Sequence, residues 1–276
     1  NNTALGGNAL KSNTTANNNT AVGDDALKAN TTGDQNVAIG ATALDANTTG
    51  RNGVAVGFTA LGANTTGDNN VAVGVGSLQT NTTAGNNVAI GNQALKVNTT
   101  GGSNTAVGTS SLSSCTTGTG NTAVGSSAGS NITTGSNVSC FGDNAVPSTA
   151  TTDNEIILGN ANVGAVRCAT GGVTTLSDGR DKTDIVDLSD GLDFVNTLKP
   201  VKFKWQTREG VPNKDGKVRA GFIAQDLQKA TEGKEHLNLV YSENPKKLEV
   251  THINLLPTLV KAIQELSAKV TALEAG

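Results

Sequence analysis

A glycine recurs every 17 residues along the first 160 positions of the chain, and no other feature constrains its fold as strongly. The glycine column stands at positions 6, 23, 40, 57, 74, 91, 108, 125, 142 and 159. With the same step, leucine recurs from position 10 to 112, threonine from 15 to 134, and asparagine from 2 to 121 with Gly53 interrupting. A fixed short period predicts a solenoid, in which each repeat forms one coil and stacking completes a shared core.

Each repeat contains a short segment with strand character, such as positions 36–40. Val37 and Ile39 share one face and Ala38 lies on the other, because side chains alternate along a strand. We expect the Val/Ile face to join Leu44 in the core and the Ala face to admit a neighbouring chain. An Asn-Thr-Thr-Gly turn closes the coil, and stacked Asn and Thr columns would form side-chain ladders.

The segments Asn-Val-Ala-Ile-Gly and Asn-Thr-Ala-Val-Gly resemble the head repeats of trimeric autotransporter adhesins of the YadA type. This resemblance covers most of residues 1–160 and implies a trimeric, left-handed parallel β-roll. The coil here is longer by an Ala-Leu-x-x-Asn-Thr-Thr-Gly segment. Its Asn-x-Thr triplets also match a glycosylation acceptor, but they fall on the turn of each repeat, so we interpret them as turn chemistry.

The composition changes abruptly near position 176. The first 176 residues carry 13 charged side chains, whereas the last 100 carry 30. The repeat also decays before this point, because Gly129 and Val146 break the leucine column. We therefore predict a mainly β chain with a solenoid at 1–160, a connector at 161–176 and a small α+β domain at 177–276.

The charged domain mixes helix and strand patterns. Ser189-Asp190 precedes a helix pattern that stops before Pro200. The other expected elements are strands at 201–205, 218–224, 237–241 and 248–250, a turn at 211–216, a helix at 225–230 and a final helix at 254–275.

The final helix carries an apolar heptad seam. Leu256, Ile263 and Val270 stand at its a positions, and its d positions are Leu259, Leu266 and Leu273. Ile or Val at a with Leu at d, taken alone, favours a dimer. The β-roll resemblance implies a trimer, and so short a seam follows its attached domain, so we predict a homotrimer.

The start of the charged domain, Ser177-Asp178-Gly179-Arg180-Asp181-Lys182, resembles the opening motif of the S74 peptidase family. This family includes the intramolecular chaperone domains of phage endosialidases and other tail fibres. The similarity continues through residues 198–205, 221–226 and 255–266, and so spans essentially all of 177–276.

The S74 resemblance implies a domain that trimerises, helps the preceding fibre to fold and then cuts the Leu176–Ser177 bond. Ser177 would be the nucleophile and Lys182 the general base. A lysine serves as a base only when burial or a neighbouring cation favours its neutral form. Arg180 is a candidate neighbour, and Asp178 would stabilise the turn or pair with Arg180. The competing interpretation is that Ser-Asp-Gly-Arg is turn chemistry in a domain that does not cut.

Three functional classes follow from these patterns. The leading one is a phage tail-fibre segment, assembled in the host cytoplasm and carried on the virion. Its partners would be other virion tail proteins, through a missing N-terminal region, and a host receptor that is a glycan or an outer-surface protein. The alternative is a trimeric bacterial surface adhesin with a non-cleaving trimerisation domain. A glycosidase is disfavoured, since residues 1–176 contain few aromatics and no recurrent pair of carboxylates.

Other classes are excluded by composition. A net charge of −3 argues against nucleic acid or an anionic membrane as partner. No apolar run reaches the roughly 18–20 residues of a membrane span. Cys115, Cys140 and Cys168 show no metal-binding spacing, so we interpret them as buried small residues in a reducing compartment and expect no metal or cofactor. His236 and His252 lie far from the Ser/Lys pair in sequence, which favours structural roles.

Overall fold

The computed structural model describes residues 1–163, 177, 180, 182–204, 217–242 and 248–276. The chain divides into two compact units, Asn1–Gly164 and Ala165–Gly276. Most of the predicted connector, and the predicted turn at 211–216, lie outside the described residues.

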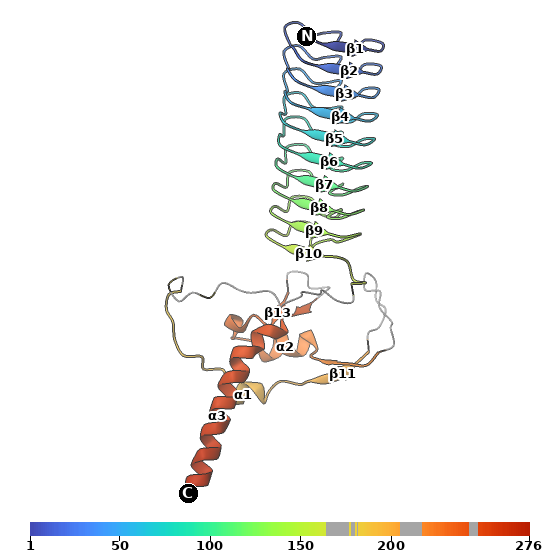
Figure 1. The fold of residues 1–276 in the computed structure, drawn as a ribbon. Helices are drawn as coiled ribbons and strands as arrows, with labels where there is room; N and C mark the ends of the chain where they lie inside the picture. The colour runs from blue at the N-terminus through green and yellow to red at the C-terminus, as the bar shows by residue number, and fades with distance from the viewer. Residues whose placement is uncertain (164–176, 178–179, 181, 205–216, 243–247) are drawn as a thin grey trace. The chain divides into compact units, whose positions relative to one another are not determined.

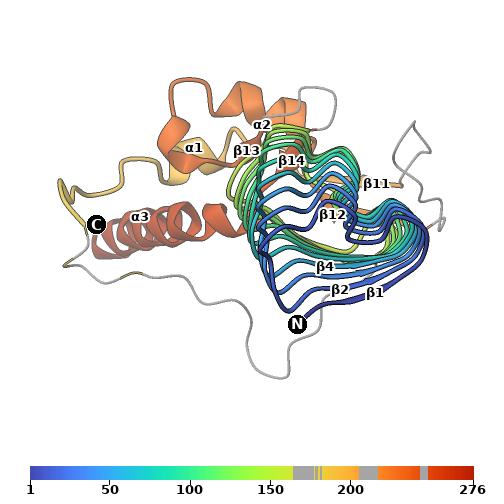
Figure 2. The ribbon, with the colours of Figure 1, turned by 90° about the horizontal axis from the view of Figure 1, so that it is seen from above.

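The first unit is a parallel β-solenoid (Figure 1). Ten three-residue strands form one sheet in chain order, and successive strands are paired with an offset of 17 residues. Viewed along the stack, the coils superpose with a slow rotation (Figure 2). The predicted parallel solenoid of 17-residue repeats is therefore confirmed. The strands are β1 (Thr3–Leu5), β2 (Thr20–Val22), β3 (Val37–Ile39), β4 (Val54–Val56), β5 (Val71–Val73), β6 (Val88–Ile90), β7 (Thr105–Val107), β8 (Thr122–Val124), β9 (Ser139–Phe141) and β10 (Ile156–Leu158).

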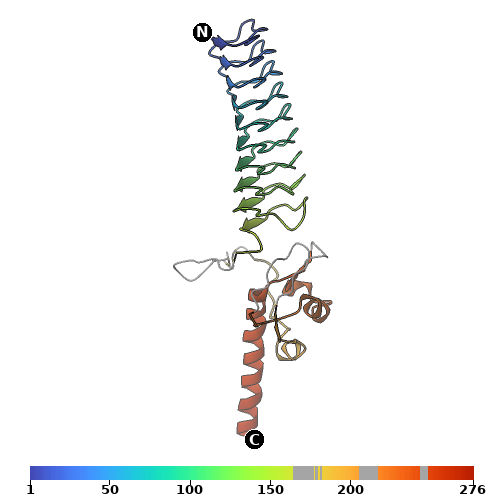
Figure 3. The same ribbon diagram turned by 90° about the vertical axis from the view of Figure 1, so that its right-hand side faces the viewer.

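The alanine side of each strand faces the core, whereas we expected the Val/Ile side to be buried. Ala38 is fully buried, whereas Ile39 is 41% exposed and Val37 is half-buried. The same pattern recurs from β2 to β9, with Cys140 as the inward residue of β9. The coil interior is narrow and already holds a leucine and two asparagines from each full repeat, so only a small side chain fits there. The valines and isoleucines are left on the outside, where the strands line one side of the stack (Figure 3).

The leucine column supplies most of the apolar volume of this core. Leu27, Leu44 and their equivalents up to Leu112 are buried, and they adopt φ near +50°, a region that few non-glycine residues occupy. Where Gly129 replaces the leucine, the buried side chain of Ile132 fills the space. A Cβ at position 129 would lie only 3.2 Å from Ile132 Cδ1. The column glycines make the corner after each strand. A side chain at Gly40 would meet the Gly57 carbonyl at 2.5 Å.

Side-chain ladders run along the core. The Asn47 amide nitrogen donates to Asn30 Oδ1 at 2.8 Å, and Asn64 donates to Asn47 Oδ1 at 3.0 Å. In the second asparagine column, the backbone amide of Asn36 donates to Asn19 Oδ1 at 2.8 Å. These bonds satisfy polar groups that would be costly to bury unpaired. Threonine hydroxyls also form a ladder, but they come from the column of Thr31 rather than from the exposed column at 15 to 134 that we singled out.

The second unit is a small α+β domain. Its described elements are α1 (Leu192–Val195), β11 (Val201–Phe203), β12 (Arg219–Gly221), α2 (Ala224–Ala230), a 3₁₀ turn η2 (Glu235–Leu237), β13 (Val240–Tyr241), β14 (Glu249–Val250), a 3₁₀ turn η3 (His252–Leu255) and α3 (Leu256–Ala275). The strands form two antiparallel pairs, β11–β12 and β13–β14. A core of Phe194, Leu237, Leu239 and Leu255 holds these elements together.

Most of the predicted elements of this unit are present; the strands are shorter than expected, and α2 begins at Ala224, which we expected to end the strand at 218–224. The helix expected up to Leu198 ends at Val195, and the strand expected from 237 begins at Val240 because η2 precedes it. Neither Ser189 nor Asp190 caps α1, contrary to the prediction; the cap residue is Gly191. The final helix starts at Leu256 after η3, two residues later than expected.

Candidate functional site

Ser177 and Lys182 meet in the second unit. Lys182 Nζ donates a hydrogen bond to Ser177 Oγ at 2.7 Å, which joins a hydroxyl and an amine five residues apart. Both side chains are exposed, and so is Arg180. Leu176 and Asp178, which we predicted as the scissile residue and a supporting residue, lie outside the described residues.

The Ser177–Lys182 distance is suitable for proton transfer between a nucleophile and its base. In that role the neutral amine of lysine accepts the hydroxyl proton, the reverse of the donation seen here. Burial favours the neutral form of a lysine. Lys182 is exposed in the single chain, so base catalysis requires that other groups or another chain bury it and favour its neutral form.

Asp190 is the first buried side chain after the Ser177–Lys182 pair. Its carboxylate is 4% exposed, bonds to Lys234, and lies 2.8 Å from His236 Nε2. The Lys234 hydrogen bond, followed by that of His236, holds the pKa of Asp190 below its usual value although burial opposes this. Lys234 Nζ also lies 5.9 Å from the centre of the Phe194 ring. His236 thus fastens the α2–η2 segment to the start of α1, as the structural interpretation predicted.

The start of α1 is capped from a helix 73 residues away. Glu265 of α3 accepts a hydrogen bond at 2.8 Å from the backbone amide of Leu192. The neighbouring Gly191 makes room for the carboxylate, since a Cβ there would lie 2.6 Å from Glu265 Cδ. The sequence analysis gave Glu265 no role of its own, although it lies within the S74-like stretch 255–266 and at ion-pair spacing from Lys261, whose Nζ lies 3.8 Å away.

Helix α3 has a buried side and an exposed apolar side. Thr258 and Ala262 are buried on the side that packs within the unit. The predicted trimerisation residues lie on the other side and are between 40% and 82% exposed in the single chain: Leu256, Leu259, Ile263, Leu266, Val270 and Leu273. The single chain therefore leaves the heptad seam uncovered.

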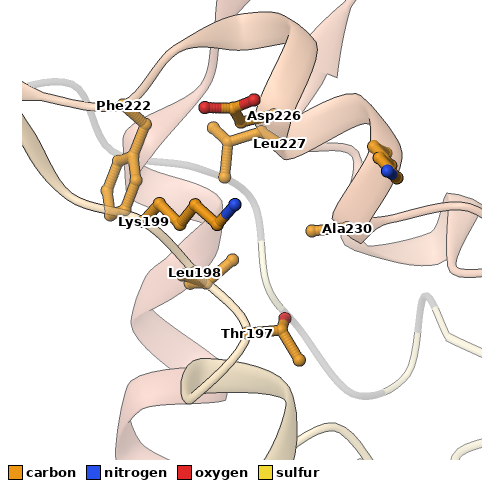
Figure 4. Close-up of a pocket in the computed structure, with 8 residues that line it drawn as sticks. Thr197, Leu198, Lys199, Phe222, Asp226, Leu227 and Ala230 are labelled. Atoms are coloured by element: carbon orange, nitrogen blue, oxygen red, sulfur yellow. The ribbon is translucent and has the colours of Figure 1, made fainter.

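A pocket of about 260 Å³ lies between α2 and the chain that leads from α1 to β11. Lys199 extends across it between Leu198 and Leu227, with Asp226 and Phe222 nearby (Figure 4). Neither Ser177 nor Lys182 lines this pocket. The ring centre of the second histidine, His252, lies 6.1 Å from that of Phe222 with the two planes tilted by 35°, which is a packing contact.

The described part of the chain shows neither a metal site nor a membrane-spanning helix. No cluster of three or more His, Cys, Asp or Glu side chains there has the geometry of a metal site. Among the described helices, none combines the length and apolar character needed to cross a membrane. Cys115 and Cys140 are buried free thiols, and Cys168 lies outside the described residues.

Comparison with known families gives one match. Residues 177–237 match the family described as peptidase S74, chaperone of endosialidase, and the match starts at Ser177. This finding confirms the S74 resemblance for that part of the chain. No curated protein and no solved structure matches the chain.

Proposed function

We propose that this chain is a segment of a phage tail fibre whose C-terminal domain trimerises, chaperones the folding of the solenoid and then cuts the Leu176–Ser177 bond. The solenoid would be the shaft or the receptor-binding region, carried on the virion after assembly in the host cytoplasm. The observation that carries the proposal is the 2.7 Å contact between Lys182 Nζ and Ser177 Oγ at the first residue of the S74 match.

The proposed cut is an acyl shift followed by hydrolysis. Lys182, as the neutral amine, takes the Ser177 hydroxyl proton while Ser177 Oγ bonds to the Leu176 carbonyl carbon. The bond from that carbon to the Ser177 nitrogen then breaks, and the nitrogen takes the proton from Lys182 and becomes the free α-amine of Ser177, whose Oγ now carries the acyl group as an ester. Water hydrolyses the resulting ester, which frees the Leu176 carboxylate and regenerates the serine hydroxyl.

The outward side of β1 to β10 supports assembly with further copies of the chain. This strand face consists of the first and third residues of every strand, and none of them is charged. At about 4.8 Å per coil the strand face is about 45 Å long. Apolar strips of this size on soluble proteins mark interaction sites. A second copy has the same 17-residue period, so its strand face would match this one along the whole length.

A C-terminal chaperone fits the folding problem of such a stack. Registering several parallel solenoid chains requires non-local contacts, which form slowly and are prone to misassembly. The exposed seam of α3 would bring the chains together and raise their local concentration. A later cut would make assembly irreversible.

Expression followed by a denaturing gel tests the cut. Wild-type protein should give two fragments, and Ser177→Ala should give one band near 27.7 kDa. A single wild-type band that Ser177→Ala leaves unchanged would refute self-cleavage. Light scattering of Ser177→Ala tests assembly separately. A trimer that Ile90→Lys on the strand face weakens is expected, and a monomeric Ser177→Ala protein would refute the homotrimer.

A further inference from the structure

We propose that Glu265 is a positioning residue for this cut, because it ties helix α3 to the segment that carries Ser177 and Lys182. The inference rests on the proposed self-cleavage and gives a role to a residue beyond 177–237, the part of the chain that the family comparison matches.

The hydrogen bond from the Leu192 amide to the Glu265 carboxylate stabilises a helix that is weak by itself. Helix α1 has four residues and no side-chain cap of its own, so it has little intrinsic stability. Its first amide, at Leu192, donates to the Glu265 carboxylate at 2.8 Å. A hydrogen bond to a carboxylate is about twice as strong as a neutral one. A side chain at Gly191 would displace this carboxylate, because a Cβ there would lie 2.6 Å from Glu265 Cδ.

This hydrogen bond holds the chain close in sequence to the Ser177–Lys182 pair. Residues 182–187 are exposed, and Leu188 is the first side chain of this segment that packs on the core. Asp190 is then held by Lys234 and His236, and Leu192 by Glu265. Leu188 and residues 190–192 are therefore the first points after Lys182 at which the chain is held to the rest of the unit; we call residues 190–192 the anchor, and Glu265 forms one side of it.

Helix α3 carries both the contact to α1 and the apolar seam proposed for assembly. Glu265 and Leu266 are consecutive on α3, so their side chains diverge by about 100° around the helix. Glu265 contacts the start of α1, whereas Leu266 belongs to the exposed seam. A second copy packed on the seam would immobilise the helix that holds Leu192. The anchor would then place the Ser177–Lys182 pair more accurately once chains have assembled.

The test compares first-order cleavage rates after pulse-labelled cell-free synthesis of the full chain. Glu265→Ala should slow the cut roughly tenfold or more, since misplacing reacting groups by about 1 Å costs up to ~100-fold. Gly191→Ala, which keeps Glu265 but displaces it, should act in the same direction. Glu265→Gln retains an acceptor and should recover most of the rate, while Glu274→Ala on the same helix serves as the matched control at wild-type rate.

A stability control separates positioning from folding. Leu227→Ala truncates a buried residue of α2 that belongs neither to the anchor nor to the core cluster around Phe194. It should lower the melting temperature at least as much as Glu265→Ala yet cut faster than that variant. The inference is overturned if Glu265→Ala and Gly191→Ala cut at wild-type rate, or if cleavage rate follows melting temperature across all variants.

A second measurement does not depend on the cut. In the Ser177→Ala background, hydrogen exchange at the Leu192 amide should accelerate on adding Glu265→Ala and remain unchanged on adding Glu274→Ala. Equal exchange in both variants would refute the tie itself. If wild-type protein is never cut but the exchange result holds, the proposed self-cleavage has failed and Glu265 retains only a structural contact.

Discussion

The backbone amide of Gly53 donates to Asn36 Oδ1 at 2.8 Å, but Gly53 has no side chain to continue the ladder to Asn70. In the other coils of this column an asparagine accepts from the next backbone amide and donates to a carbonyl 14 residues ahead, as Asn36 does to Gly50. Position 53 is therefore a gap in an otherwise regular buried network.

Gly53→Asn should stabilise the solenoid. It would add two buried hydrogen bonds, each worth about 0.5–1.5 kcal/mol. A Cβ at 53 would come within 2.9 Å of Asn36 Oδ1, the end of a flexible side chain that adjusts easily. Calorimetry should show a higher melting temperature. Gly53→Ala, which adds a Cβ but no amide group, controls for the lost flexibility of the unfolded chain; an equal gain there would contradict the account.

The inward position of alanine gives a second prediction. Ala72→Val should destabilise the solenoid by about 1–3 kcal/mol, because the added methyl groups have no room in the core. Val71→Thr on the outer side should change the free energy of unfolding by no more than about 0.5 kcal/mol. Thr20 already occupies the equivalent place in β2. Denaturant unfolding measures the free energy of unfolding of both variants. A larger loss for Val71→Thr than for Ala72→Val would support the orientation expected from the sequence, with the valines inside.

Asp190 predicts the acid sensitivity of the C-terminal unit. Its folded pKa lies below the unfolded value of about 3.9. The group therefore contributes stability that is present above pH 3.9 and is lost as pH falls through the lower folded pKa. Asp190→Asn in the Ser177→Ala background should be less stable at pH 7, and the gap should narrow towards pH 2. Exposed Asp187→Asn is the control. A gap that is the same at pH 7 and pH 2 would contradict this assignment.

The buried thiols give a fourth prediction. Burial raises the pKa of Cys115 and raises that of Cys140 to about 11. With Cys168 replaced by serine, the folded protein should not react with a thiol reagent at pH 8, because too little thiolate is present. Unfolding should release two reactive thiols. Rapid labelling of the folded protein would show that the coils around these residues open readily.

The solenoid and the length of its coil were predictable because the same residue types recur at the same position of every repeat. The glycine, leucine and asparagine columns define the coil length, and a column such as Asn19–Asn36 can only be satisfied by stacking. The inward side was not predictable. Alternation shows that Val37 and Ile39 share a face, but which face is buried depends on the volume left inside the coil.

The candidate site shows a similar division. Ser177 and Lys182 were recognisable from a local motif, because they are separated by only five positions in the sequence. The cap of α1 could not be predicted, because Glu265 reaches Leu192 across 73 residues of sequence. The local cap signal of Ser189-Asp190 was misleading, since Asp190 is instead held by Lys234 and His236.

Intact-mass spectrometry of the natively purified protein tests the central proposal most directly. The wild-type chain should yield two masses, residues 1–176 and residues 177–276 with Ser177 as a new N-terminus, while Ser177→Ala and Lys182→Met each remain whole. A wild-type sample that consists only of the uncut 27.7 kDa chain, or one cut elsewhere than Leu176–Ser177, would contradict the proposal.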